Sequence, residues 1–188
     1  MTTKSVTGAW WTAPLSNNID RGARSGWRLL VYLAALGAAG VALHAGFRWP
    51  LHLPGHHGLE WMALLAFARV TASRRWSASA VGLAAAGVAL APAWGFHDPL
   101  VPLAYLLAGV LLDGLCLAGE RMPRGVVLPV GAALAFTASG LVTFLSAFHP
   151  GVGLWLAGHL GFGLLGGLMG TWLGAQTRRA LAGKQRRL

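Results

Sequence analysis

Six long apolar segments, separated by short connections containing glycine, proline or charged residues, account for most of the chain. Most of them are close in length to the about 20 residues that an α-helix needs to cross a hydrocarbon core of ~30 Å. The second segment alone is too short, so it must be tilted, extended backwards through Pro54, or partly re-entrant. The pattern predicts an all-α integral membrane bundle of six transmembrane helices. The predicted segments are Trp27–Phe47, Gly58–Thr71, Ala78–Phe96, Leu100–Gly119, Val126–Phe148 and Val152–Ala175.

The two ends of the chain are polar. Residues 1–26 lack the continuous apolar region and small-residue cleavage pattern of a signal peptide, so we interpret them as a cytoplasmic or interfacial lead-in. Trp10 and Trp11 would contact lipid headgroups there. Residues 27–175 then form the membrane domain, and residues 176–188 form a basic cytoplasmic tail.

Basic residues are distributed unevenly among the connections. If six segments alternate in direction, all but one of the 15 lysines and arginines fall on one side, and Arg48 is the exception. Five or seven crossings would scatter these charges over both sides. The positive-inside rule then places both termini in the cytoplasm and predicts a multi-pass protein of the cytoplasmic membrane.

Composition narrows the function classes. Charged residues make up 11% of the chain, less than half of the about 25% typical of soluble domains, which excludes an ordinary soluble enzyme or a disordered tail. The net charge of +10 does not predict nucleic-acid binding, because no basic stretch alternates with aromatic residues outside the apolar segments. The single cysteine, Cys116, excludes an internal disulfide and is expected in the core.

All seven histidines fall in the predicted outer loops or in the outer halves of the helices. Imidazoles gathered at one entrance suit a transition metal, a metal-containing cofactor, or an anionic or heteroaromatic ligand. The same histidines could instead be solvated loop residues, or could form hydrogen bonds between helices. Trp49, Trp61, Trp94 and Trp155 lie at the same level, where they form either part of the same site or an aromatic belt.

These outer residues make up the predicted binding site. Because Pro54 and Gly55 separate His52 from His56, this histidine pair is not expected on a regular helix. Glu60 is the nearest acid to His56 and His57. The predicted binding residues are His52, His56, His57, Glu60, Trp61, Trp94, His97, Asp98, His149, Trp155 and His159. The candidate metal ligands among them are His56, His57, His97 and His149.

Two polar features lie inside the apolar segments. Asp113 in the fourth segment is either functional, as intramembrane acids often are, or it snorkels or pairs locally near Arg121. Ser139 and His159 are expected at similar depth on neighbouring antiparallel helices. They predict either an interhelical hydrogen bond or a serine–histidine pair similar to that of rhomboid-like proteases, although Thr137 departs from the Gly-x-Ser-Gly motif of that family.

Small residues recur at four-residue spacing in the first and last segments, which allows helices to approach closely in lipid. In the last segment the pairs are Ala157/Gly161, Gly163/Gly167 and Gly166/Gly170, and we expect them to pack inside the bundle. In the first segment the pairs are Ala34/Ala38 and Ala35/Ala39, for which a partner-docking face is an alternative to internal packing.

The chain resembles the substrate-binding S-components of energy-coupling-factor (ECF) vitamin and metal transporters. The resemblance depends on the six short helices, the irregular connection before the second segment, the alanine pairs of the first segment and the GVLLDG sequence of the fourth. It implies a non-enzymatic subunit that binds a vitamin or metal-containing cargo at its outer mouth, cobalamin-like as the first expectation and a transition-metal ion as the second. It further implies docking on a transmembrane partner through Ala34, Ala35, Ala38 and Ala39, with separate ATPases supplying energy, and no phosphate-binding G-x-x-x-x-G-K-[ST] motif is present in this chain.

Other interpretations stay open. The chain lacks the Met-His start of nickel and cobalt S-components, which argues against a free metal ion as cargo. GVLLDG is also similar to MreD-type cell-shape scaffolds, which would bind no cargo. A haem protein would use His44 and His159 as axial ligands. No sequence pattern identifies the cargo or a cofactor.

Overall fold

The computed structural model describes residues 26–46, 53–72, 74–96, 98–144 and 151–185. Within these ranges the chain forms six α-helices and a short 3₁₀ helix and contains no β-strand, which confirms the all-α prediction. The helices are α1 (Gly26–Gly46), α2 (Gly58–Ala72), α3 (Ser77–Ala89), η2 (Pro92–Trp94), α4 (Leu100–Ala118), α5 (Arg124–Phe144) and α6 (Val152–Gln185).

Among the described residues, four helices are long and apolar enough to cross a membrane, which indicates a multi-pass membrane protein. These candidate spans are Gly26–Gly46, Leu100–Ala118, Arg124–Val142 and Val152–Gly183. The 15 residues of α2 and the 13 of α3 give lengths of only about 22 and 20 Å. Both helices are therefore short, and the prediction that only the second segment is too short was wrong.

The third segment differs from its predicted bounds because its helix ends at Ala89. Leu90 and Ala91 continue the apolar sequence, but Pro92 then starts η2 and Gly95 adopts φ +70°. A proline lacks the backbone N–H that an α-helix needs to continue, and a left-handed conformation strains any residue with a side chain. The last segment differs in the opposite sense, since α6 continues past the predicted end at Ala175 into the predicted tail.

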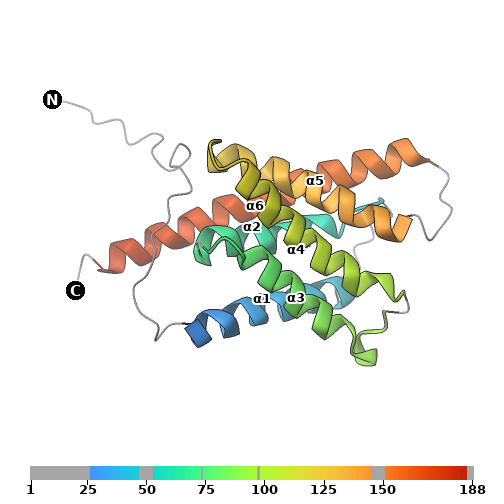
Figure 1. The fold of residues 1–188 in the computed structure, drawn as a ribbon, viewed down its shortest axis with the longest axis horizontal. Coiled ribbons are helices and arrows are strands. Elements are labelled where there is room, and N and C mark those ends of the chain that lie inside the picture. The colour runs from blue at the N-terminus through green and yellow to red at the C-terminus, as the bar shows by residue number, and fades with distance from the viewer. Residues whose placement is uncertain (1–25, 47–52, 73, 97, 145–150, 186–188) are drawn as a thin grey trace.

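The helices alternate in direction along the bundle, and α1 begins at the same end at which α6 finishes (Figure 1). We call this the basic end, because every arginine in the described ranges lies near it. These arginines are Arg28, Arg69, Arg74, Arg75, Arg121, Arg124, Arg178 and Arg179. The opposite end carries His44, His56, His57 and His159, and we call it the histidine end.

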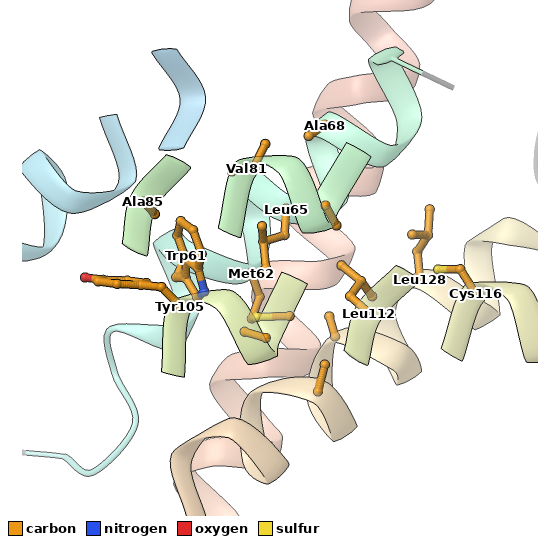
Figure 2. Packing of buried hydrophobic residues seen from close by; sticks show 14 of the residues in the cluster. Trp61, Met62, Leu65, Ala68, Val81, Ala85, Tyr105, Leu112, Cys116 and Leu128 are labelled. Carbon is orange, nitrogen blue, oxygen red and sulfur yellow. The ribbon is translucent and has the colours of Figure 1, made fainter. Parts of the chain in front are cut away.

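Helix α2 lies at the centre of the packing and α1 at its edge. Nine of the 15 residues of α2 are buried, against four of the 21 residues of α1. Helix α2 packs mainly on α6 and also contacts α1, α3 and α5. Figure 2 shows Trp61, Met62 and Leu65 of α2 among side chains of α3, α4 and α5. Cys116 belongs to this core, as predicted.

Glycines of α6 allow its close contact with two neighbouring helices. Gly163 and Gly167 lie against α5, whereas Gly166 and Gly170 lie against α2. A Cβ atom at Gly170 would stand 2.1 Å from the carbonyl oxygen of Ala63. These two pairs confirm the predicted internal packing. The Ala157/Gly161 pair does not, because a Cβ at Gly161 would meet no atom within 4 Å.

The small residues of α1 divide between two faces. Gly37 packs on the backbone of α3, and a Cβ at Gly40 would lie 2.6 Å from the Trp61 ring. The alanine pairs face elsewhere, since Ala34, Ala35 and Ala39 are exposed and Ala38 is half-buried. The glycines therefore dock α1 onto the bundle, and the alanines remain on its outer surface.

Asp113 forms a buried ion pair near the basic end, but with a different partner from the one expected. Its Oδ1 lies 3.2 Å from Nε of Arg69, a contact not aligned as a hydrogen bond. Its Oδ2 accepts hydrogen bonds from the backbone nitrogen and hydroxyl of Ser79, both 2.7 Å long. Arg121 is exposed. The carboxylate thus joins α2, α3 and α4 and does not snorkel.

Candidate functional site

A cavity of about 280 Å³ lies at the histidine end of the bundle, lined by α1, α2, α4, α5, α6 and the turn before α2. We call it the aromatic cavity. Its lining residues are His44, Gly55, His57, Trp61, Asp98, Val101, Ala104, Tyr105, Phe136, Ser139, Gly140 and His159.

The turn before α2 carries His57 to this cavity. Residues 54–57 form a turn and not a helix, so backward extension of the second helix through Pro54 was wrong. Gly55 adopts φ +80°, and a Cβ there would lie 2.9 Å from the backbone nitrogen of His159. Only glycine combines this conformation with such close contact. The turn therefore packs on α6 and places His57 in the wall of the cavity.

His44 and His57 form a stacked pair fixed by hydrogen bonds at both rings. Their ring centroids are 4.1 Å apart, with planes 12° from parallel. Nδ1 of His44 lies 2.6 Å from the Tyr105 hydroxyl. Nδ1 of His57 donates to Oε1 of Glu60 at 3.0 Å, so Glu60 lies beside His57 as expected. The pair thus links α1, α2 and α4.

A second cavity, of about 290 Å³, adjoins this pair. His44 and His57 line both cavities, and His56, Trp94 and Phe96 line the second one. The ring of His56 lies 3.9 Å from that of His57, and its Nδ1 donates to the carbonyl oxygen of Leu53 at 2.7 Å. Three imidazoles are consequently adjacent at this point.

His159 lies on the other side of the aromatic cavity, between two aromatic rings. Its centroid is 4.9 Å from Phe136 and 4.1 Å from Trp155, with both pairs stacked. Its Nδ1 donates to the carbonyl oxygen of Trp155 at 2.9 Å. The imidazole is therefore held within α6 while its Nε2 side approaches Gly140 of α5.

Ser139 and His159 line the same cavity, but the predicted hydrogen bond between them was wrong. The Ser139 hydroxyl donates to the carbonyl oxygen of Phe136 at 3.0 Å, so each side chain bonds to its own helix. A serine nucleophile needs a base that accepts its proton. This geometry therefore gives no support to the protease interpretation.

Each of the four described histidines uses Nδ1 for a hydrogen bond. Such a bond at Nδ1 is common in metal-binding histidines. However, nearly parallel rings 4.1 Å apart cannot both direct in-plane lone pairs at one ion about 2 Å away. No group of three or more His, Cys, Asp or Glu in the described ranges is placed to hold a metal. Two candidate ligands, His97 and His149, lie outside these ranges, as does the candidate binding residue His52.

The described tryptophans of the histidine end do not form a lipid-facing belt. Trp61 is buried and packs edge-on against Tyr105, with centroids 4.8 Å apart. Trp155 is also buried, and Trp94 is half-buried in the wall of the second cavity. The belt interpretation was therefore wrong for Trp61 and Trp155, while Trp49 lies outside the described residues.

The structure brings four of the predicted binding residues into the aromatic cavity: His57, Trp61, Asp98 and His159. Asp98 has a structural role as well, because its Oδ1 accepts a hydrogen bond from the backbone nitrogen of Leu100 at the start of α4. Sequence reasoning did not include Tyr105 and Phe136, and it considered His44 only as a haem ligand. A hydroxyl within an apolar span was the available signal for Tyr105, since such a group needs a partner.

A comparison of the chain with protein-family models, curated proteins and solved structures finds no match. Function must therefore be inferred from the cavities, from the groups that line them and from the distribution of charge.

Proposed function

We propose that this chain is the membrane-embedded binding subunit of a micronutrient uptake transporter, and that its cargo binds in the aromatic cavity. The observation that carries this function is the position of the cavity at the histidine end, opposite every arginine in the described ranges. Because basic residues gather on the cytoplasmic side of membrane proteins, the cavity then lies toward the outside, where a transported solute arrives.

The chemistry of the cavity favours a compact heteroaromatic vitamin. Trp61 and Phe136 supply flat apolar surface, while the Tyr105 hydroxyl and Nε2 of His159 supply hydrogen-bonding groups. The volume of about 280 Å³ is just below the roughly 300–1,000 Å³ usual for drug-sized ligands. A ligand of one or two rings therefore fits this space better than a cobalamin-like corrinoid. A transition-metal ion is the less favoured cargo, because the stacked His44 and His57 would first have to separate.

Energy coupling would come from other proteins. The exposed alanines Ala34, Ala35 and Ala39 on α1, together with the half-buried Ala38, offer a face of small side chains on the edge helix. Close approach of helices in lipid requires such a face. An ECF-type transmembrane partner with its ATPases is the proposed occupant.

The test is a ligand titration of the full chain in lipid nanodiscs. The panel contains thiamine, riboflavin, biotin, cobalamin, nickel and cobalt, with calorimetry as the readout. We expect saturable binding of a one- or two-ring vitamin, weakened at least about tenfold by Ala104→Trp, which fills the cavity. Leu103→Trp is the matched control, because Leu103 is the exposed neighbour on α4. A chain that binds none of these compounds, or that loses affinity equally in both variants, would overturn this function, and a Soret band would support haem binding in its place.

A further inference from the structure

The basic end of the bundle contains a small cavity of its own, unrelated to the aromatic cavity. Its volume is about 130 Å³, and it lies between the last turn of α2, the start of α5 and the C-terminal part of α6. Its lining residues are Val70, Arg124, Thr171, Ala175, Arg178 and Arg179. Three arginines from two helices therefore line one opening.

The acids in the described ranges do not neutralise two of these arginines, Arg124 and Arg178. Asp113 pairs with Arg69, and Glu120 pairs with Arg75 at 3.0 Å. Glu60 and Asp98 belong to the histidine end. Within the same ranges, Arg124 and Arg178 consequently have no carboxylate partner.

Arg124 adds an unsatisfied donor. Its Nε is buried and has no hydrogen-bond partner in the part of the chain that the structure describes. The positive charge of Arg178 acts on it from α6. Burying a donor without a partner is unfavourable, and more so when the group is charged. An anion in the cavity would offset the positive charge of Arg124 and Arg178 and reduce the repulsion between them.

We propose that this cavity is a binding site for a phosphate group, either the headgroup of an anionic lipid or a free phosphate. Guanidinium groups offer planar, paired N–H donors that match phosphate oxygens. A volume of about 130 Å³ equals that of about four waters at ~30 Å³ each, which accommodates one tetrahedral oxyanion. The position at the basic end places the site at the level of cytoplasmic headgroups.

Two arms of one experiment distinguish the sources. In the first, the full chain is delipidated in neutral detergent and its melting temperature is measured against inorganic phosphate, with sodium chloride at equal ionic strength as reference. In the second, native mass spectrometry measures retention of phosphatidylglycerol against phosphatidylcholine of the same chain length. A shift with phosphate identifies free phosphate as a ligand, and selective retention of phosphatidylglycerol identifies the lipid.

Three variants test the location of the site. We expect Arg178→Gln to weaken anion binding at least about fivefold. Ala175→Leu keeps every charge but fills the cavity, and we expect a similar loss. Arg121→Gln removes an exposed arginine outside the cavity and should stay within about twofold of wild type. Each variant is first checked for a single species and wild-type helicity. Equal effects of Arg121→Gln and Arg178→Gln, full binding in Ala175→Leu, or no binding in either arm would overturn the proposal.

Discussion

The hydroxyl oxygen of Tyr105 lies 2.6 Å from Nδ1 of His44 and joins α4 to the edge helix α1 in the wall of the aromatic cavity. The partners are 61 residues apart in the sequence. His44 stacks on His57, and both rings line both cavities at the histidine end. This one hydrogen bond therefore holds the stacked pair in place. The cavity wall therefore depends on a contact between distant segments.

We expect Tyr105→Phe to destabilise the protein by about 1–3 kcal/mol, because His44 loses its partner in a largely buried site. The readout is the thermal unfolding of the purified chain in detergent. The same change should also weaken binding of the vitamin identified by the titration, since the His44 ring is no longer held in the cavity wall.

Tyr32→Phe is the matched control for this prediction. The Tyr32 hydroxyl lies 2.8 Å from Oγ1 of Thr71 and links α1 to α2 near the basic end, away from the aromatic cavity. It should lower stability without changing ligand affinity. If both variants altered affinity equally, the role of Tyr105 in the cavity would be refuted.

The buried ion pair between Arg69 and Asp113 should contribute far more to stability than the exposed pair between Arg75 and Glu120. The side chains of the first pair are 5% and 6% exposed, and those of the second are 56% and 40% exposed. Asp113→Ala leaves a buried guanidinium uncompensated and should cost about 3–5 kcal/mol. Glu120→Ala should cost less than about 1 kcal/mol because water screens that pair. Thermal unfolding of both variants checks this ranking, and equal losses would contradict it.

The apolar pattern and the one-sided basic residues were sufficient to predict six helices with alternating directions. Helix lengths were harder to predict, because apolarity alone does not show where a helix ends. Leu90 and Ala91 are as apolar as the residues of α3 before them, yet Pro92 and Gly95 turn the chain. In α6 the helix instead continues through charged residues, since Arg178 and Arg179 lie within it.

The gathering of histidines could be predicted, but their partners could not. Which side chains meet depends on the rotation of each helix about its axis. In a membrane protein both the core face and the lipid face are apolar, so the sequence carries only a weak periodic signal for that rotation. Phe136 therefore looked like an ordinary residue of an apolar segment, and the hydroxyl of Tyr105 indicated a need for a partner without showing which one, although both residues line the aromatic cavity.

Gly140 controls the space around His159. A Cβ at position 140 would lie 2.7 Å from Cδ2 and 2.9 Å from Nε2 of the imidazole. The ring cannot move away without breaking its stacks on Phe136 and Trp155. We expect Gly140→Ala to shift the fluorescence of Trp155 and to weaken ligand binding about tenfold. Gly161→Ala is the control, because a Cβ there meets no atom within 4 Å; it should change stability by less than about 0.5 kcal/mol. Equal responses of the two variants would show that His159 is not sterically confined.

The outer face of α1 provides a test that separates transport from binding. Ala39 is exposed on this face, on the side of the helix away from the glycines that pack on the bundle. If a transmembrane partner docks there, Ala39→Trp keeps the helices apart and should reduce cellular uptake of the identified vitamin at least about tenfold, with its affinity for the purified chain unchanged. Leu83→Trp on α3 is the control, since Leu83 is also exposed but lies outside the alanine face. Normal uptake in the Ala39 variant would exclude this face as the docking site, whereas a loss of affinity would mean that the substitution disturbs the bundle itself.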